Sequence, residues 1–242
     1  MRNCGALSRL NDERSMCARF NLKSNLSQIF GYYSVTHPAM FQWTPRYDIR
    51  PTHQVPIIKQ TVDGSRVAEL ARWGLIPKWA KSATEANINA RSETVATKPS
   101  FREAIKSRRC IIPADGFYEF ESTSAHTKQK WHIFRADHNL LSFAGLWETW
   151  LDDDEQAIAT CAIVTTEANS FMAQIHDRMP VVLSPDAFAE WLDPALTDVS
   201  KLGHLFTPCP DGWLARDPVA NIQHEDSPRC ILPVKQQRSL FD

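Results

Sequence analysis

Glycine and net charge are both scarce in this 242-residue chain. It has 8 glycines against 15 prolines, a balance that favours rigid turns. The formal net charge is −1, so any nucleic-acid binding must come from a local patch. No apolar run approaches transmembrane length, and residues 1–15 lack the apolar core of a secretory signal. We therefore expect a cytoplasmic protein with no membrane partner.

Metal-binding and nucleotide-binding signatures are also missing. The six cysteines are scattered, with no C-x-x-C pair and no Cys/His cluster at zinc-ligand spacing. Without a secretion signal, disulfides are not expected either. The chain has no G-x-G-x-x-G and no Walker loop. These absences predict a protein with no bound metal and no cofactor.

Hydrophobic periodicity places strands in the middle of the chain and helices towards its ends. Helical spacing or capping signals cover 22–33, 100–108 (cap Ser100), 184–192 (cap Ser184) and 198–206. Strand-like runs cover 55–61, 66–73, 110–114, 116–121, 130–136, 140–148 and 157–166, with an Asp-Gly hairpin turn between the first two. The pattern predicts an α+β fold: a single domain with a curved, mostly antiparallel sheet forming a pseudo-barrel with flanking helices. We expect the domain to span 16–234, between a removable extension (1–15) and a polar tail (235–242).

Two stretches carry polar groups that a plain fold would not need. In "NINARSET", Asn89, Arg91 and Glu93 alternate and would share one face of an extended segment. An exposed strand edge or loop with a local ion pair also explains the pattern, and the pattern alone slightly favours that interpretation. In "ADGFYEF", Glu119 falls among aromatic residues, which tends to raise a carboxyl pKa and suits a proton donor. The alternative is a solvated Glu119 with the tyrosine side as core.

A third stretch, "QIHDRMP", is too polar for a typical strand. Its His176 has the residue type for acid–base work near neutral pH, and Arg178 suits phosphate binding. Read in isolation, such a segment is more often an ordinary loop.

Seven motifs in register resemble the SOS-response-associated peptidase family, the abasic-site-processing domain. They span nearly the whole chain from Met16 to about Val234. The motifs are "MCARF" (16–20), "RYDIRP" (46–51), "RWGLIPKW" (72–79), "NARSET" (89–94), "ADGFYEF" (114–120), "IVTT" (163–166) and "IHDRMPVVL" (175–183).

The resemblance implies a reaction and a set of site residues. The family links covalently to abasic sites in single-stranded DNA through a cysteine exposed by removal of its initiator Met, here Cys17 after Met16. The implied catalytic residues are Cys17, Asn89, Glu119 and His176. The implied DNA contacts are Arg19, Arg91, Arg178, Trp79 and Thr165. The implied partner is single-stranded DNA containing abasic sites, and we expect a monomer.

An amino-terminal cysteine suits this chemistry. Its α-amine has a pKa near 8, against about 10.4 for lysine, so more of it is neutral at pH 7. The amine condenses with the aldehyde of the opened sugar, and the thiol of the same residue then closes a thiazolidine ring. Because Cys17 follows sixteen residues, its nitrogen is free only if the working chain begins there. We expect a start at Met16 or proteolysis before Cys17.

The sequence departs from the family pattern at four positions. Ala18 stands where the family usually has Gly, and Ala80 stands where a second Trp often follows Trp79. Asp48 replaces the usual Asn, and a carboxylate near DNA would repel phosphate. Arg50 replaces the usual Ala.

Two other functions remain open from the residues. Cys17, His176 and Asn89 are also the residue types of a Cys-His-Asn peptidase. A non-catalytic module that binds single-stranded DNA would use the arginines and Trp79 without needing Cys17. Self-cleavage before Cys17 would combine peptidase and lesion chemistry in one chain.

Overall fold

The computed structural model describes residues 18–37, 41–122 and 128–234. The predicted extension (1–15), Cys17 and the polar tail (235–242) lie outside the described residues. Within the described chain the strands are β1 (Phe20–Leu22), β2 (Arg46–Ile49), β3 (Gln54–Gln60), β4 (Arg66–Trp73), β5 (Asn89–Arg91), β6 (Arg109–Ala114), β7 (Gly116–Ser122), β8 (Lys128–Arg135), β9 (Leu141–Leu151), β10 (Ala157–Glu167), β11 (Arg178–Pro180) and β12 (Leu214–Val219).

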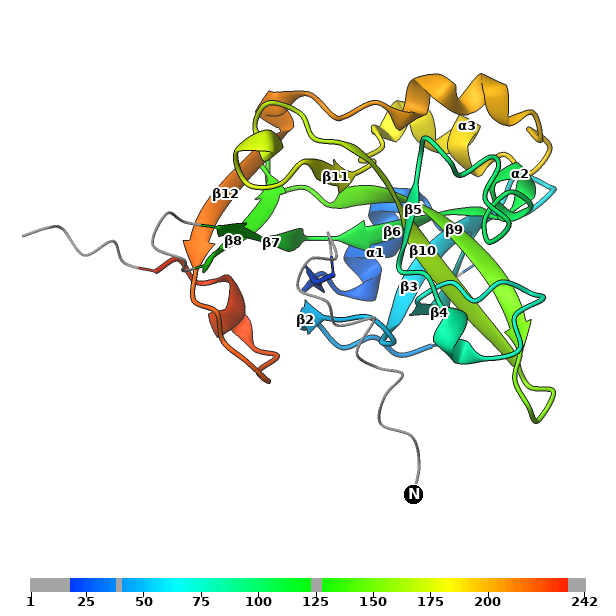
Figure 1. Ribbon diagram of the computed structural model, residues 1–242, viewed down its shortest axis with the longest axis horizontal. Coiled ribbons are helices and arrows are strands. Elements are labelled where there is room, and N and C mark those ends of the chain that lie inside the picture. Colours follow the sequence, from blue (N-terminus) through cyan, green and yellow to red (C-terminus); the bar gives the residue numbers. More distant parts are fainter. Residues whose placement is uncertain (1–17, 38–40, 123–127, 235–242) are drawn as a thin grey trace, which may run out of the picture.

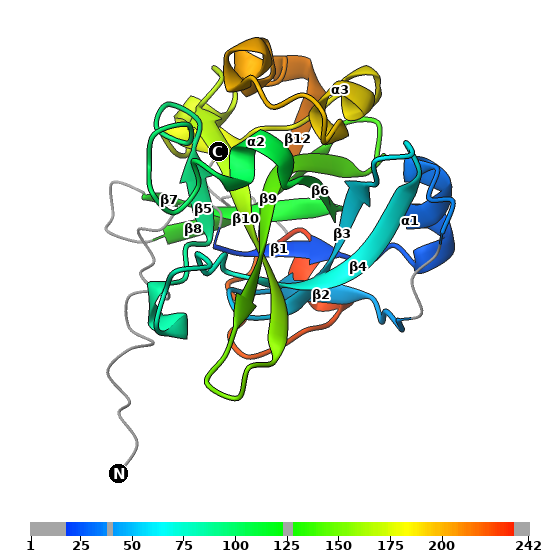
Figure 2. The same cartoon turned by 90° about the vertical axis from the view of Figure 1, so that its right-hand side faces the viewer.

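The helices in the described chain are short. They are α1 (Leu26–Tyr33), α2 (Ala104–Ser107) and α3 (Phe188–Leu192), with 3-10 segments η2 (Ala83–Glu85), η3 (Met172–Gln174), η4 (Pro185–Ala187), η5 (Val199–Phe206), η6 (Asp211–Trp213) and η7 (Pro228–Ile231). Helix α2 contacts β6 and β9, helix α3 contacts β6, and both views show the two helices on the same side of the molecule (Figures 1 and 2). No helix of the described residues has the length and apolar character needed to cross a membrane.

Four helix predictions are corrected. Helix α1 begins at Leu26 because Asn25 and Gln28 form a capping box, whereas Leu22 belongs to β1. Helix α2 covers only the last part of 100–108, and Ser100 is not its cap. Ser184 precedes η4 without a side-chain capping bond, and residues 199–206 form a 3-10 rather than an α-helix.

Five strands close into a barrel. Strand β3 pairs with β4 and β6, β6 pairs with β9, β9 with β10, and β10 returns to β4. The first four of these pairings are antiparallel, so β10 must run in the same direction as β4. The observed β10–β4 pairing is indeed parallel, as an odd-numbered ring requires. The prediction of a mostly antiparallel curved sheet is thereby confirmed, with one parallel closure at β10–β4.

The hairpin between β3 and β4 is confirmed. The Thr61 N–H donates to the Ser65 carbonyl (2.9 Å), and Asp63 accepts from the Ser65 N–H (3.0 Å). Gly64 closes the turn with φ of +86°, a left-handed conformation that glycine adopts without steric cost. The Asp-Gly signal therefore marks the turn correctly.

A second, five-stranded sheet packs against the barrel. Its order is β12-β8-β7-β1-β2, and it meets the barrel through aromatic side chains. Phe20 of β1 makes edge contacts with Trp73 of β4 (4.9 Å between centroids) and with Phe143 of β9. Phe117 of β7 also contacts Phe143. These buried rings fix β1, and with it the chain that follows Cys17, against the core.

Candidate functional site

Three neighbouring strands carry most of the predicted DNA contacts. Strand β10 lies between β5 and β11. Thr165 stands opposite Arg91 of β5 on one side and Pro180 of β11 on the other, and Asn89 pairs with Ile163. The structure thus brings Asn89, Arg91, Thr165 and Arg178 into one region, although they are far apart in sequence. The segment "QIHDRMP" was expected to be too polar for a strand. That expectation is wrong for Arg178, which begins β11.

The Arg178 guanidinium group donates hydrogen bonds to Glu93 and to Thr165. Its two terminal nitrogens contact the two carboxylate oxygens of Glu93, with Nη2–Oε2 at 2.9 Å. Nη2 also donates to the Thr165 carbonyl (2.9 Å). The hydrogen bond from Arg178 lowers the pKa of Glu93. The local ion pair expected for "NARSET" therefore joins Glu93 to a residue on another strand, not to Arg91.

His176 lies directly before β11 and is partly exposed. Its Nδ1 accepts the Arg178 backbone N–H (3.1 Å) and also lies 2.9 Å from Asp177 Oδ1. One nitrogen cannot accept and donate at once. The Asp177 side chain is largely solvated, so we assign Nδ1 as the acceptor, which leaves Nε2 as the protonated nitrogen.

Glu119 lies on β7, which pairs with β1. It is buried, with 5% exposure, and faces Trp131 across the β7–β8 ladder. The Tyr118 N–H donates to the Arg19 carbonyl (3.0 Å), and Phe20 pairs with Phe117. Both faces of this segment are buried, so the alternative of a solvated Glu119 is wrong.

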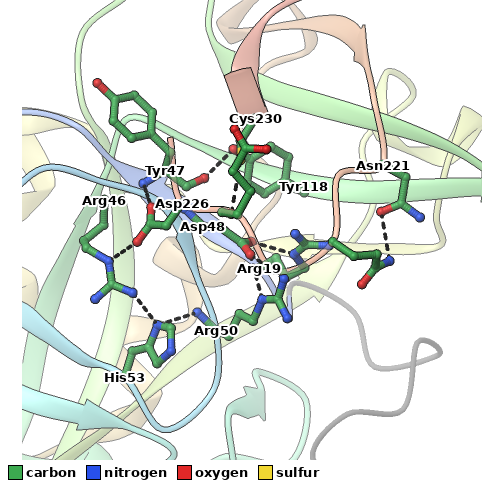
Figure 3. A network of polar contacts seen from close by, with 12 residues as sticks. Arg19, Arg46, Tyr47, Asp48, Arg50, His53, Tyr118, Asn221, Asp226 and Cys230 are labelled. Atoms are coloured by element: carbon green, nitrogen blue, oxygen red, sulfur yellow. Dashed lines mark hydrogen bonds and ion pairs between the residues drawn. The ribbon is translucent and has the colours of Figure 1, made fainter. Parts of the chain in front are cut away.

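Asp48 of the "RYDIRP" motif binds two guanidinium groups, those of Arg19 and Arg50 (Figure 3). Arg19 Nε donates to Asp48 Oδ1 (2.6 Å), and Arg50 Nε donates to Asp48 Oδ2 (2.7 Å). The Asp48 side chain is only 3% exposed. Asp48 and Arg50 are therefore partners, and the negative charge of Asp48 is offset by two guanidinium groups. The expected repulsion between Asp48 and phosphate is accordingly weakened.

The carboxyl-terminal segment covers the edge of β2. Asp226 accepts the backbone N–H groups of Tyr47 and Asp48 and pairs with Arg46 (Figure 3). Burial acts to raise the Asp226 pKa, but hydrogen bonds from Tyr47 and Arg46 leave it lowered. Nδ1 of His53 contacts Arg46 Nη2 (3.1 Å), which ties the next turn to the same network. Because β2 is the last strand of its sheet, this carboxylate protects an otherwise open edge.

Lys130 is a cation buried beneath this network. It is 1% exposed, and its Nζ lies 3.8 Å from the centroid of the Tyr118 ring. Burial, reinforced by Arg19, lowers the Lys130 pKa to about 8. The Tyr118 hydroxyl donates to the Tyr47 carbonyl (2.6 Å), which fixes the ring under the amine.

Trp79 lies outside the regular strands, in the segment after β4. Its side chain is 58% exposed and available for stacking. Ala80, where the family often has a second Trp, is instead buried against Ile76 and Trp150. The Trp150 indole donates to the Ala80 carbonyl (2.8 Å), so this position serves packing in the present chain.

Cys17 lies outside the described residues, which begin with the next residue, Ala18. Cys17 is two residues before Arg19, so their α-carbons are within about 7 Å of each other. The sequence reasoning did not single out Lys130 or Asp226. Lys130 sits in a strand-like run whose alternation gives no sign that its lysine is buried. Asp226 lies in an irregular segment whose contacts are with residues about 180 positions away in sequence.

The chain matches a family model over residues 16–222, described as SOS response associated peptidase (SRAP). The chain belongs to the SRAP family. Abasic site processing protein YoqW of Bacillus subtilis is 40% identical over 196 residues, which cover 80% of this chain and 87% of that protein. Abasic site processing protein HMCES of Gallus gallus is 28% identical, covering 80% of this chain and 68% of its own length.

Solved structures of two bacterial proteins share the fold. A Bacteroides thetaiotaomicron protein superposes with a TM-score of 0.83 at 27% identity, covering 90% of this chain and 100% of its own. A Bordetella bronchiseptica protein gives a TM-score of 0.72 at 28% identity, covering 84% of this chain and 100% of its own. The family resemblance inferred from seven motifs is thereby confirmed, together with the fold class.

Proposed function

We propose that this chain processes abasic sites by trapping them in single-stranded DNA. The trap is a covalent bond to Cys17 when that residue is the amino terminus. The relatives YoqW and HMCES, both named as abasic site processing proteins, support this function for an SRAP member. Capture of the lesion would shield a reactive sugar while the DNA is repaired.

The observation that carries the proposal is the pairing of β1 with β7. The Arg19 carbonyl accepts from Tyr118, the residue that directly precedes Glu119. Because Cys17 is two residues before Arg19, chain connectivity brings it near the strand of the buried Glu119. A carboxyl group enclosed by protein is suited to hold a proton for transfer.

The reaction proceeds in two balanced steps. The neutral α-amine adds to the sugar aldehyde and forms an imine, and one water molecule leaves. The thiol then adds across the C=N bond: sulfur bonds to the carbon, and the nitrogen gains a proton. Glu119 donates the proton that the departing sugar oxygen needs, and His176 Nε2 moves protons during imine formation or reversal. Asn89 orients the amine or the aldehyde oxygen through its amide.

Arg19, Arg91 and Arg178 supply contacts to phosphates, and Trp79 supplies a stacking surface. Thr165 contributes to the same region through its position between β5 and β11. Binding by such contacts is expected to weaken as salt rises.

A crosslinking assay tests the proposal. Protein beginning at Cys17 is mixed with a single-stranded oligonucleotide carrying one abasic site and separated on a denaturing gel. A slow band is expected, and it should be lost in Cys17→Ala and in protein that retains residues 1–16. Absence of the band with correctly started protein refutes the proposal.

The role of Glu119 has its own comparison. Glu119→Gln keeps the shape of the side chain but removes the proton, and should slow crosslink formation by about 100-fold or more. Glu103→Gln, an exposed carboxylate beside α2, is the matched control and should leave the rate unchanged. Equal rates for Glu119→Gln and the wild type contradict a proton-donor role.

Peptidase activity is restricted in this proposal to the release of Cys17. The exposed terminus arises by initiation at Met16 and removal of that Met, or by cleavage before Cys17. A Cys-His-Asn peptidase would instead hydrolyse added peptides with its Cys17 nitrogen still blocked. Peptide turnover by full-length protein, with no crosslink after correct processing, would favour that alternative.

A further inference from the structure

Four side chains form an unbalanced charge cluster where β2, β8 and the residue before β1 meet. This phosphate cluster consists of Arg19, Asp48, Arg50 and Lys130. Asp48 is its one carboxylate, and it is shared by Arg19 and Arg50. The adjacent Arg46 is already paired with Asp226. With Lys130 protonated, the cluster therefore carries a net charge of about +2.

Two donors of the cluster lack an acceptor among the described residues. They are Arg19 Nη2 and Lys130 Nζ, both buried from solvent. Lys130 has the Tyr118 ring at 3.8 Å, but a ring face does not replace an anion for a buried ammonium group. Burial of Arg19 Nη2 and Lys130 Nζ without an acceptor lowers the stability of the fold. A bound anion would supply the acceptor and the negative charge that both groups need.

An anion can reach the cluster from the side of Arg50. The Arg50 side chain is 31% exposed, whereas Arg19 is 13% exposed and Lys130 lies beneath. Figure 3 shows the guanidinium groups of Arg19 and Arg50 side by side next to Asp48. A phosphate bound beside Arg50 would contact that side chain directly. It would also be attracted by the buried charges of Arg19 and Lys130, because the protein interior has a low dielectric constant.

We propose that Arg50 and Arg19, with Lys130 beneath them, form a subsite for one backbone phosphate of the bound DNA strand. The inference rests on the proposed function and deepens it. Arg19 of the subsite is two residues along the chain from Cys17, so the phosphate that the subsite takes belongs to the DNA strand that carries the lesion. Asp48 acts as an internal counter-ion that holds both guanidinium groups in place. The paired departures Asp48 and Arg50 thus create a contact that Asn and Ala at these positions would not provide.

Fluorescence anisotropy with an undamaged single-stranded oligonucleotide tests the subsite without any crosslink. The full chain is titrated at several salt concentrations, together with Arg50→Ala, Lys130→Met and the control Lys106→Met, which removes an exposed charge on α2. We expect Arg50→Ala to reduce the slope of log K against log salt by about 0.7, the value for one phosphate on a single strand. Lys130→Met should weaken binding several-fold at low salt, and the control should leave both quantities unchanged.

A stability measurement separates binding from folding. Lys130→Met replaces a buried, unpaired charge by an apolar chain of similar length, so it should melt at or above the wild-type temperature. Weaker DNA binding by a protein that is no less stable is the expected signature. Should Lys130→Met unfold, Arg50→Ala alone decides the matter, because that side chain is partly exposed.

If Arg50→Ala and Lys130→Met both bind DNA with the affinity and salt slope of the wild type, the proposed subsite is wrong. A free-phosphate arm identifies the source of the anion: millimolar inorganic phosphate at constant ionic strength should compete with DNA in the wild type and less in Arg50→Ala. Equal competition in both proteins would also count against it. If the wild type forms no crosslink at saturating oligonucleotide, the proposed function fails independently of these binding results.

Discussion

Replacement of Glu93 by Gln should strengthen the binding of undamaged single-stranded DNA. Both terminal nitrogens of Arg178 donate to the Glu93 carboxylate, and the Arg178 side chain is only 14% exposed. A DNA phosphate that approaches Arg178 must therefore replace Glu93 as the acceptor. Glu93 is half exposed, so the pair contributes on the order of 1 kcal/mol or less. Its removal should tighten DNA binding by up to about 5-fold.

The assay is anisotropy with a short undamaged oligonucleotide at low and at moderate salt. Glu103→Gln removes the same charge from an exposed site beside α2 and controls for the change in net charge. The thermal stability of Glu93→Gln should fall by no more than about 1 kcal/mol. Affinity equal to or weaker than that of the wild type would show that Arg178 is not released for DNA, and would refute its assignment as a phosphate contact.

Three further predictions concern packing, pH and stacking. Gly116→Ala should destabilise the fold by about 1–3 kcal/mol in urea unfolding, because the new Cβ would lie 2.7 Å from the Ile133 carbonyl and 2.3 Å from His132 Nε2. Burial lowers the His132 pKa to about 3, so protons bind the unfolded state first and stability should fall as pH drops below about 6.5. Between pH 7 and pH 5 the wild type should lose about 2 kcal/mol more than His132→Gln, and equal losses would contradict the assignment. Trp79→Ala should weaken single-strand binding by about 1–3 kcal/mol without lowering the melting temperature, because this side chain is mostly solvated.

Periodicity located most strands because alternation is a local property. The run 110–114 and the hairpin around Gly64 are recognisable from residues close together in the sequence. The short strand β1 was missed because Phe20–Leu22 has too few residues to show a period, and its apolar end merges with the helical pattern of α1. Strand β11 was missed for the opposite reason, since Arg178 is polar although its backbone pairs with β10.

For the candidate site too, the sequence identified some features and only the fold decided others. The motifs identified Asn89, Glu119, His176 and Arg178 as residues of interest, and the strand register brings Asn89 and Arg178 to either side of β10. Whether Glu119 faces solvent could not be decided from alternation, because both faces of β7 proved to be buried.

Sequence alone determined the family, the fold class and the chemical types at the site, since these depend on residue identity and local spacing. Only the tertiary structure decided which charges meet. Asp48 pairs with Arg19 across β1 and β2, Arg178 pairs with Glu93 across 85 positions, and Lys130 is buried without an acceptor among the described residues. The physical reason is that ion pairing and desolvation depend on distance and burial in space, and both are set by strand pairings between residues far apart in the chain.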